Sequence, residues 1–232
     1  AYEVYQILVI LSTSAVPTAV SKLIAARVAR REYKNARAIF KCALKFSALF
    51  SGSLALITFI FAPWISRTLF GGITEVAPAL RILAPTVCIC AVMGVFRGFT
   101  QGLGTMIPTA FSQTLEQIFN AIVSIVAAAL LIGKGAAYGA AGGTLGTLVG
   151  AASGVIFLYF VYASFRPTLA RRIRKDPTKR VLDNRSIYRM VILTIVPLVL
   201  TSTVYQISSL IDSSLFSNIL KYLGYQSTFI SS

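Results

Sequence analysis

Long apolar segments constrain the fold of this chain more than any other feature. Several stretches of the 232 residues stay apolar for more than about 18 residues, which is enough for a helix to cross the ~30 Å hydrocarbon core of a bilayer. Only 12% of the residues are charged, against about 25% in a soluble domain, whereas 56% are hydrophobic. Intrinsic disorder requires low hydrophobicity and is excluded. We therefore expect an all-α polytopic bundle of transmembrane helices.

The apolar pattern predicts six spans within a single bundle that covers residues 1–232. The predicted spans are residues 4–26, 39–66, 78–99, 108–132, 140–165 and 187–216. Three of them contain a proline, namely Pro17, Pro85 and Pro197, and each proline removes a backbone hydrogen bond and kinks its helix. Such kinks are typical of transporter helices that bend or line a cavity, although they also occur simply to improve packing.

Basic residues are distributed asymmetrically between the predicted connections. The chain has 22 Lys and Arg against 7 Asp and Glu, and most of the basic residues lie in or beside two predicted loops, 27–38 and 166–186. The connections on the opposite side hold only Arg67, Arg81, Lys134 and Lys221. By the positive-inside rule, the two basic loops are predicted to be cytoplasmic. Topology thus explains the charge without a nucleic-acid partner, and anionic lipid headgroups become the expected contacts of these loops.

The residue types that support most catalysis are missing or scattered. The chain has no histidine, which excludes a histidine-dependent triad or an imidazole metal site. The three cysteines, Cys42, Cys88 and Cys90, show neither disulfide nor metal-ligand spacing. The acidic residues of the loops occur singly. We therefore expect neither an enzyme, nor a metal site, nor a bound cofactor.

A polar stripe inside the fourth predicted span is the best functional candidate. Glu116 lies eight residues into that span, about 12 Å from its predicted cytoplasmic end, and an ionised residue at mid-depth costs about 2.5–3.5 kcal/mol. Gln113, Gln117 and Asn120 share its helical face. This stripe is predicted either to line a water-filled cavity or to form hydrogen bonds to a neighbouring helix.

Three further charged residues are candidates on grounds of depth. Lys22 lies about one turn from the cytoplasmic end of the first span, where it either snorkels to the interface or serves function. Asp212 lies near the outer end of the sixth span, where interface solvation is the alternative to a functional role. Arg97 opens the stretch Arg97–Gly104, which is predicted to be a tight cytoplasmic turn.

Glycines at helical spacing mark the fifth span. Gly143, Gly146, Gly150 and Gly154 are three or four residues apart, which places them on one face of a helix and lets a neighbouring backbone approach closely. We expect a packing seam here rather than a pore lining.

Three stretches of the chain together resemble a known family. They read AVPTAVSKLIA (Ala15–Ala25), RGFTQGLGTMIPTAFSQTLEQI (Arg97–Ile118) and IVPLVLTSTVYQISSLIDSSLF (Ile195–Phe216). The chain is similar to the polysaccharide-biosynthesis branch of the multidrug/oligosaccharidyl-lipid/polysaccharide flippase superfamily, which includes the stage V sporulation protein B group and the MurJ-type lipid II flippases. The middle stretch is the most specific of the three.

The resemblance implies a bacterial plasma-membrane flippase for a lipid-linked oligosaccharide. It implies about fourteen spans in two lobes, of which this chain matches the second to seventh and lacks the second lobe. Lys22 and Arg97 would then attract the diphosphate, and Gln113, Glu116, Gln117 and Asn120 would line the cavity. Asp212, Pro17 and Pro197 would serve coupling or gating. The alternatives are a cation-coupled multidrug exporter of the same superfamily, a membrane-embedded glycosyltransferase, and a structural sporulation protein.

Overall fold

The computed structural model describes residues 16–69, 77–176, 182–183 and 185–198, together with positions 200, 201, 204 and 208. Within these residues the chain forms helices and turns and no strand, so the all-α expectation is confirmed. The helices are α2 (Val16–Ala29), α3 (Tyr33–Leu69), α4 (Ala77–Gly102), α5 (Ile107–Leu131), the 3₁₀ turn η3 (Ile132–Lys134) and α6 (Ala136–Arg174). Residues 185–198 are also helical.

Four of these helices are long and apolar enough to cross a bilayer. The qualifying segments are Tyr33–Ala62, Arg81–Gly102, Ile107–Leu131 and Ala141–Arg174. They correspond to the second, third, fourth and fifth predicted spans. The first and sixth predicted spans lie partly outside the described residues and are represented by α2 and by residues 185–198.

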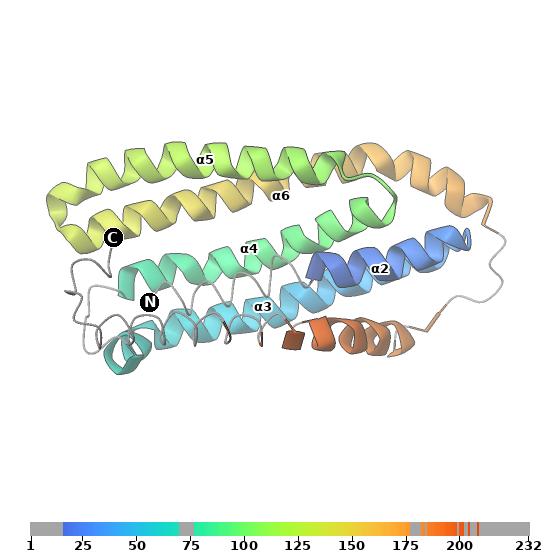
Figure 1. Ribbon diagram of the computed structural model, residues 1–232, viewed down its shortest axis with the longest axis horizontal. Coiled ribbons are helices and arrows are strands. Elements are labelled where there is room, and N and C mark those ends of the chain that lie inside the picture. The colour runs from blue at the N-terminus through green and yellow to red at the C-terminus, as the bar shows by residue number, and fades with distance from the viewer. Residues whose placement is uncertain are drawn as a thin grey trace, which may run out of the picture.

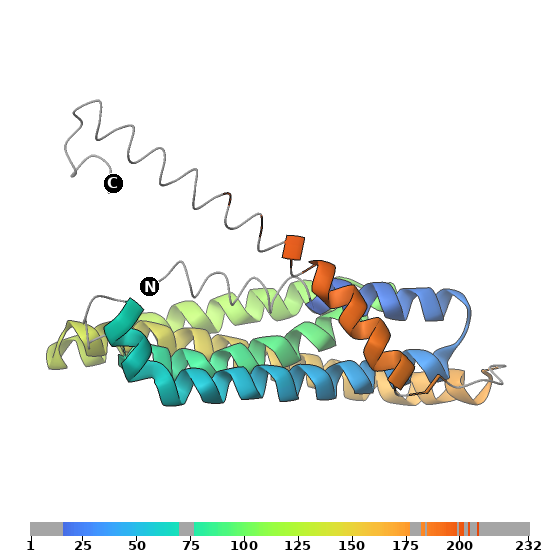
Figure 2. The same ribbon diagram turned by 90° about the horizontal axis from the view of Figure 1, so that it is seen from below.

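The long helices run side by side in an elongated bundle (Figure 1). Helix α4 is central, because it packs against α2, α3 and α6, whereas α5 packs mainly against α6 and only sparsely against α4. Helix 185–198 lies obliquely to the other helices near one end of the bundle (Figure 2). Its Ile187 and Val191 are fully buried, and they belong to the same hydrophobic core as buried residues of α2, α3, α4 and α6.

Aromatic rings fill the core between α3, α4 and α6. Phe40 of α3 lies 4.5 Å from Phe99 and 5.4 Å from Phe96, measured between ring centroids. Tyr162 of α6 closes the cluster at 5.0 Å from Phe40. Each such pair contributes about 0.5–1.5 kcal/mol beyond its buried area. These contacts hold the three helices together in the half of the bundle that carries the basic residues.

The outer surface of the bundle is apolar over most of its length. Large hydrophobic side chains are exposed on α3, α5 and α6, among them Phe50, Ile60, Ile125, Leu130 and Phe160. A water-soluble monomer rarely exposes a contiguous apolar surface of this extent, but a bilayer solvates it favourably. Together with the helix lengths, this identifies a helical membrane protein.

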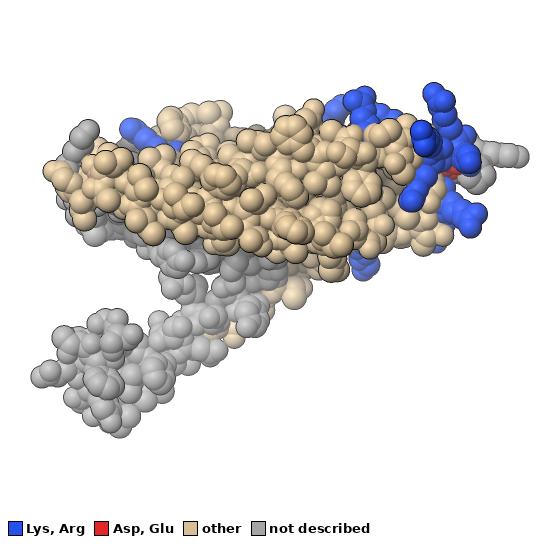
Figure 3. Space-filling view, turned by 90° about the horizontal axis from the view of Figure 1, so that it is seen from above, with Lys and Arg blue, Asp and Glu red and all other residues tan. Residues whose placement is uncertain are grey.

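The helices extend further into the basic segments than the sequence predicts. Helix α3 begins at Tyr33 rather than near residue 39, and α6 continues through Pro167 to Arg174 rather than ending near residue 165. Parts of the predicted loops 27–38 and 166–186 are therefore helical. The physical reason is that Arg and Lys favour helix nearly as much as Leu does, so the helix continues where the apolar pattern stops. Lys and Arg gather at one end of the bundle (Figure 3), where α2 and α6 end and α3 begins (Figure 1). We call this end the basic end.

Candidate functional site

A buried ion pair joins α4 to α5. Nη2 of Arg97 donates to Oε2 of Glu116 over 2.7 Å, and Nε of Arg97 donates to the hydroxyl of Ser112 over 3.1 Å. The side chains of Arg97 and Glu116 are only 6% and 17% exposed. Ser112 is completely buried. The guanidinium thus has two hydrogen-bond partners, and the charge of Glu116 is neutralised inside the span.

The turn between α4 and α5 brings these side chains together. Helix α4 ends at Gly102, and Gly104 adopts a φ of +88°, a left-handed conformation that glycine accepts without strain. Pro108 then lies in the first turn of α5, where its missing N–H costs no helical hydrogen bond. The chain reverses within a few residues, so Arg97, near the end of α4, meets Glu116, which lies in the first half of α5.

Hydroxyl groups continue the polar contact toward the turn. The hydroxyls of Thr100 and Thr109 are 3.4 Å apart, and Nε2 of Gln101 lies 3.5 Å from the Thr109 hydroxyl. Because α4 and α5 touch sparsely elsewhere, these polar groups and the ion pair make up much of their direct contact.

A ridge of α5 fits against a glycine seam of α6. The ridge consists of residues four apart, Ser112, Glu116, Asn120 and Ser124, and the seam consists of Gly142, Gly146, Gly150 and Gly154. An added Cβ at Gly150 would lie 2.6 Å from the carbonyl oxygen of Glu116, and one at Gly146 would lie 2.6 Å from that of Asn120. Rows of residues four apart on two helices interdigitate in the commonest packing class. Glycine is required here because the two backbones nearly touch.

The seam differs at one position from the sequence prediction. An added Cβ at Gly143 would meet nothing within 4 Å, whereas one at Gly142 would lie 2.6 Å from the carbonyl oxygen of Ala127. Gly142 therefore takes the place in the seam that the sequence prediction gives to Gly143. The reason is that residues at intervals of four along α6 remain against the same ridge of α5. Gly143 contributes its carbonyl oxygen instead, which lies 2.8 Å from the hydroxyl of Ser124.

The four residues of the predicted polar stripe separate into two environments. Glu116 and Asn120 face the seam, and Oδ1 of Asn120 lies 2.9 Å from the Ser124 hydroxyl. Gln113 and Gln117 are exposed on the surface of the described helices. The stripe is therefore partly an interhelical hydrogen-bonded contact and partly an outward-facing polar surface.

The remaining candidates occupy separate places. Lys22 is exposed on α2 and Pro197 is exposed on helix 185–198, whereas Pro17 is buried. Asp212 lies outside the described residues. Among the described residues, Lys22, Pro17 and Pro197 form no hydrogen bond or ion pair with Arg97 or Glu116.

Arg97 does not lie in a turn, contrary to the sequence prediction. It is inside α4, because that helix continues to Gly102. An added Cβ at Gly98 would lie 2.7 Å from the carbonyl oxygen of Pro17, and one at Gly102 would lie 2.7 Å from Cβ of Ile24. Gly98 and Gly102 are therefore contact points for α2 and not turn residues. Their spacing by four, which places both glycines on one face of α4, is the sequence signal that could have predicted a close helix contact here.

A second polar cluster at the basic end joins segments distant in sequence, and sequence reasoning missed it. Oδ2 of Asp176 accepts from the backbone N–H of Lys34 over 2.7 Å, and Oδ1 of Asn35 accepts from the N–H of Leu182 over 3.0 Å. Asp176 thereby satisfies one of the free N–H groups in the first turn of α3. A carboxylate is favoured at this position by the helix dipole.

Glu32 completes the contact at the start of α3. Its carboxylate accepts from Nδ2 of Asn35 over 3.0 Å and from Nη1 of Arg27 over 3.1 Å. These hydrogen bonds, the one from Asn35 first, hold the pKa of Glu32 below its ordinary value of 4.5 against partial desolvation. Asn35 thus links the start of α3 to both Glu32 and the segment after α6.

The described residues contain no group of three His, Cys, Asp or Glu side chains that could hold a metal ion. The carboxylates of Glu116 and Glu32 are instead engaged by Arg97 and Arg27, and that of Asp176 accepts from the backbone N–H of Lys34.

Comparisons with known proteins relate the chain to one protein family and to individual bacterial proteins. Residues 1–222 match the family described as "Polysaccharide biosynthesis protein". The chain is 29% identical to stage V sporulation protein B of Bacillus subtilis over 74% of its length, which is 32% of that relative. It is 25% identical to the lipid II flippase MurJ of the same organism over 97% of its length, which is 43% of that relative. The chain thus spans less than half the length of these curated relatives. No solved structure matches it.

Proposed function

The chain belongs to the polysaccharide biosynthesis protein family, and from this premise we propose that it forms one lobe of a flippase. The cargo would be a polyprenyl-diphosphate-linked saccharide, such as a precursor of peptidoglycan or another polysaccharide, carried across the bacterial plasma membrane by alternating access. The similarity to a lipid II flippase along 97% of the chain carries this proposal. The same similarity favours a transporter over an enzyme.

The chemistry of such a cargo sets the demands on the protein. The saccharide and the diphosphate cannot cross hydrocarbon unaided, whereas the polyprenyl tail can remain in lipid. A protein that moves the headgroup needs a polar passage between two lobes. Gln113 and Gln117 support this interpretation, because exposed amides within the span of α5 would otherwise face acyl chains. We propose that they line the passage opposite a second lobe.

Charge suggests how the headgroup is attracted. Lys22 is an exposed cation on α2, and in our proposal it draws the diphosphate toward the passage from the basic end, which would be cytoplasmic. Arg97 is engaged by Glu116 and Ser112, so it reaches a diphosphate only by exchanging one anionic partner for another. Glu116 would then be free to hold a coupling cation. Asn120 would remain in the α5–α6 contact.

Bending of helices would accompany the cycle. We propose that Pro17 and Pro197 give α2 and helix 185–198 the kinks that gating requires, and that Asp212 contributes to coupling. The basic end would lie against anionic lipid headgroups of the cytoplasmic leaflet.

Complementation tests the proposal. The full-length protein is expressed in Bacillus subtilis depleted of its lipid II flippases, and lipid II in the outer leaflet is measured. We expect the wild type to restore export and Lys22→Gln to reduce it severalfold. Arg30→Gln, which removes an equal charge at the basic end, should leave export unchanged.

Membrane levels of all three proteins are measured in parallel. If a well-expressed wild type failed to restore export, the proposed function would be contradicted. If the wild type and Lys22→Gln restored export equally, the proposed role of Lys22 would be contradicted.

A further inference from the structure

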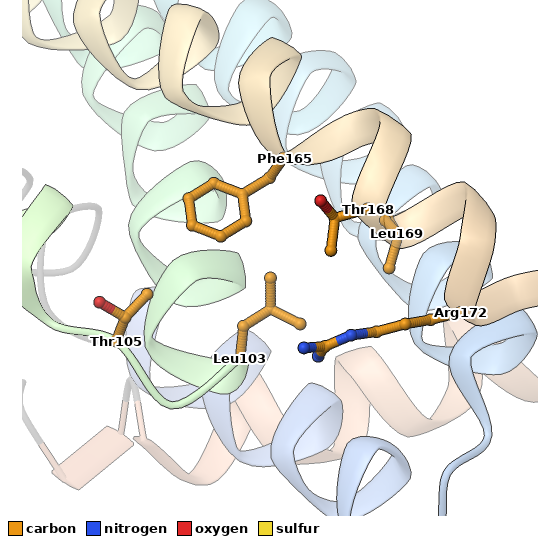
Figure 4. A pocket seen from close by; sticks show the side chains of 6 residues that line it. All are labelled: Leu103, Thr105, Phe165, Thr168, Leu169 and Arg172. Atoms are coloured by element: carbon orange, nitrogen blue, oxygen red, sulfur yellow. The ribbon is translucent and has the colours of Figure 1, made fainter.

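A pocket opens at the basic end between α6 and the turn that follows α4. Its volume is about 190 Å³, and its lining is formed by Leu103, Thr105, Phe165, Thr168, Leu169 and Arg172. Figure 4 shows the guanidinium of Arg172 extending from α6 toward Leu103, with the ring of Phe165 farther along the same helix. The lining therefore combines apolar side chains, two hydroxyls and one cation.

The pocket lies where the surface changes from apolar to basic. Helix α6 exposes Tyr159, Phe160 and Phe165, and its last turn then carries the basic residues Arg171, Arg172 and Arg174. Phe165 and Arg172 are seven residues apart, which is about 10 Å along a helix. The headgroup region of one leaflet is about 5–8 Å thick. In a bilayer whose hydrocarbon ends near Phe165, the pocket would extend from the edge of the hydrocarbon into the headgroup layer.

Arg172 is held in position for an anionic ligand. Its guanidinium carbon lies 5.7 Å from the centroid of the Tyr33 ring of α3, an arrangement that favours the cation and orients the planar group. Neither of the two ion pairs between described residues involves Arg172. A planar guanidinium binds two oxygens of a phosphate in a fixed geometry.

We propose that this pocket binds the headgroup of an anionic glycerophospholipid. Arg172 holds the phosphate, the hydroxyls of Thr105 and Thr168 bind its oxygens or the glycerol, and Leu103, Leu169 and Phe165 contact the start of the acyl chains. The bound lipid connects the α4–α5 turn to the end of α6. This inference rests on the proposal that the basic end lies against anionic lipid headgroups, and it does not depend on which cargo the flippase carries.

Photocrosslinking in nanodiscs tests the site. The protein is placed in phosphatidylcholine nanodiscs with a trace of photoactivatable phosphatidylglycerol at about 0.3 M salt, where the charge of exposed side chains is screened. We expect labelling of the peptides that contain Leu103 and Phe165. Unlabelled phosphatidylglycerol should compete in a saturable manner, and additional phosphatidylcholine should not.

Matched variants distinguish lipid binding in the pocket from attraction of the lipid by the general charge of the surface. Arg172→Gln should reduce labelling about tenfold, the effect of losing a charge-assisted hydrogen bond. Arg174→Gln, in the same last turn but outside the pocket, should retain labelling within about twofold because its charge is screened. Equal losses in both variants would overturn the proposal.

Competition in the wild type decides the question even where a variant fails to fold. Equal competition by phosphatidylcholine would reduce the pocket to a nonselective crevice and would overturn the proposal. Competition by a polyprenyl-diphosphate saccharide alone would assign the pocket to the transported lipid and would also overturn it.

Discussion

Arg97 and Glu116 form a 2.7 Å ion pair between α4 and α5, two helices that otherwise touch each other sparsely. The same Glu116 offers its backbone to the seam, because its carbonyl oxygen faces Gly150 of α6. One residue therefore fixes α5 to both of its neighbours. The ion pair lies toward the α4–α5 turn, and the close backbone contact with the glycine seam of α6 extends from Glu116 along α5.

Loss of either charge of the ion pair should destabilise the protein strongly. Arg97→Gln and Glu116→Gln are each expected to lower the free energy of unfolding by about 3 kcal/mol, because the remaining charge is buried without a partner. The double variant should lose less than the sum of the single variants. Denaturant titration in micelles, followed by a thiol-reactive dye that reports exposure of the buried Cys42 and Cys90, measures these values.

A neighbouring substitution serves as the control for the ion pair. Thr114→Ala changes an exposed residue of α5 and should alter the unfolding free energy by less than about 0.5 kcal/mol. Strict additivity of the two charge-removing substitutions would show that Arg97 and Glu116 do not interact.

Substitution by alanine should change the unfolding free energy differently at Gly150, which lies in the seam of α6, and at Gly143, which lies outside it. Gly150→Ala is expected to lower the unfolding free energy by about 1–3 kcal/mol, because the new methyl group meets the backbone of α5. Gly143→Ala meets open space and should be neutral or stabilising by up to about 1 kcal/mol through helix propensity. Equal effects in the same dye-based titration would contradict the assigned seam.

The contact between α2 and α4 should depend on Gly98. Gly98→Ala forces the methyl group toward the carbonyl oxygen of Pro17 and should loosen α2. Hydrogen exchange monitored by mass spectrometry is then expected to increase in residues 16–29. Gly52→Ala in α3, where an added Cβ meets nothing within 4 Å, is the matched control and should leave this exchange unchanged. Unaltered exchange in Gly98→Ala would rule out the close approach of α2.

The two faces of α5 should differ in their access to water. In a background with Cys42, Cys88 and Cys90 replaced by Ala, Gln117→Cys is expected to react with a water-soluble maleimide. Ile125→Cys should resist it, because Ile125 is 71% exposed on an apolar surface suited to lipid. Protection of both positions would place Gln117 against acyl chains and remove it from the proposed passage.

The pKa of Glu32 should respond to its hydrogen bond with Asn35. Asn35→Ala is expected to raise this pKa toward 4.5 by removing the main group that lowers it. A lowered carboxyl pKa stabilises the folded state above pH 4.5, and that contribution is lost as the pH falls through the lowered value. The variant should therefore show a smaller loss of stability on acidification. Carboxyl NMR titration of labelled Glu measures the pKa directly, and an unchanged value would contradict the assigned contact.

Sequence reasoning succeeded where the signal is local. The apolar runs predicted α3, α4, α5 and α6 because each span must satisfy its own backbone within a bilayer. It placed helix ends less well, since the start of α3 and the end of α6 are basic and still helical. The glycine-rich stretch Arg97–Gly104 predicts a turn, yet Arg97 is inside α4, and Gly98 and Gly102 lie where α2 packs against that helix.

Contacts between distant segments could not be predicted from periodicity. Asp176 binds the N–H of Lys34 across 142 residues, and no local pattern marks that partnership. The glycine spacing predicted that α6 would pack closely, but it did not identify α5 as the partner or distinguish Gly142 from Gly143.

By itself, the sequence determined that this chain is an all-α membrane protein with its basic residues concentrated near a few helix ends, and it pointed to the family. These properties follow from hydrophobicity and length, which act on each segment separately. Only the tertiary structure decided that Glu116 turns inward to Arg97 while Gln117 remains exposed. The rotation of a helix about its own axis is set by the neighbours against which it packs, and those neighbours come from other parts of the chain.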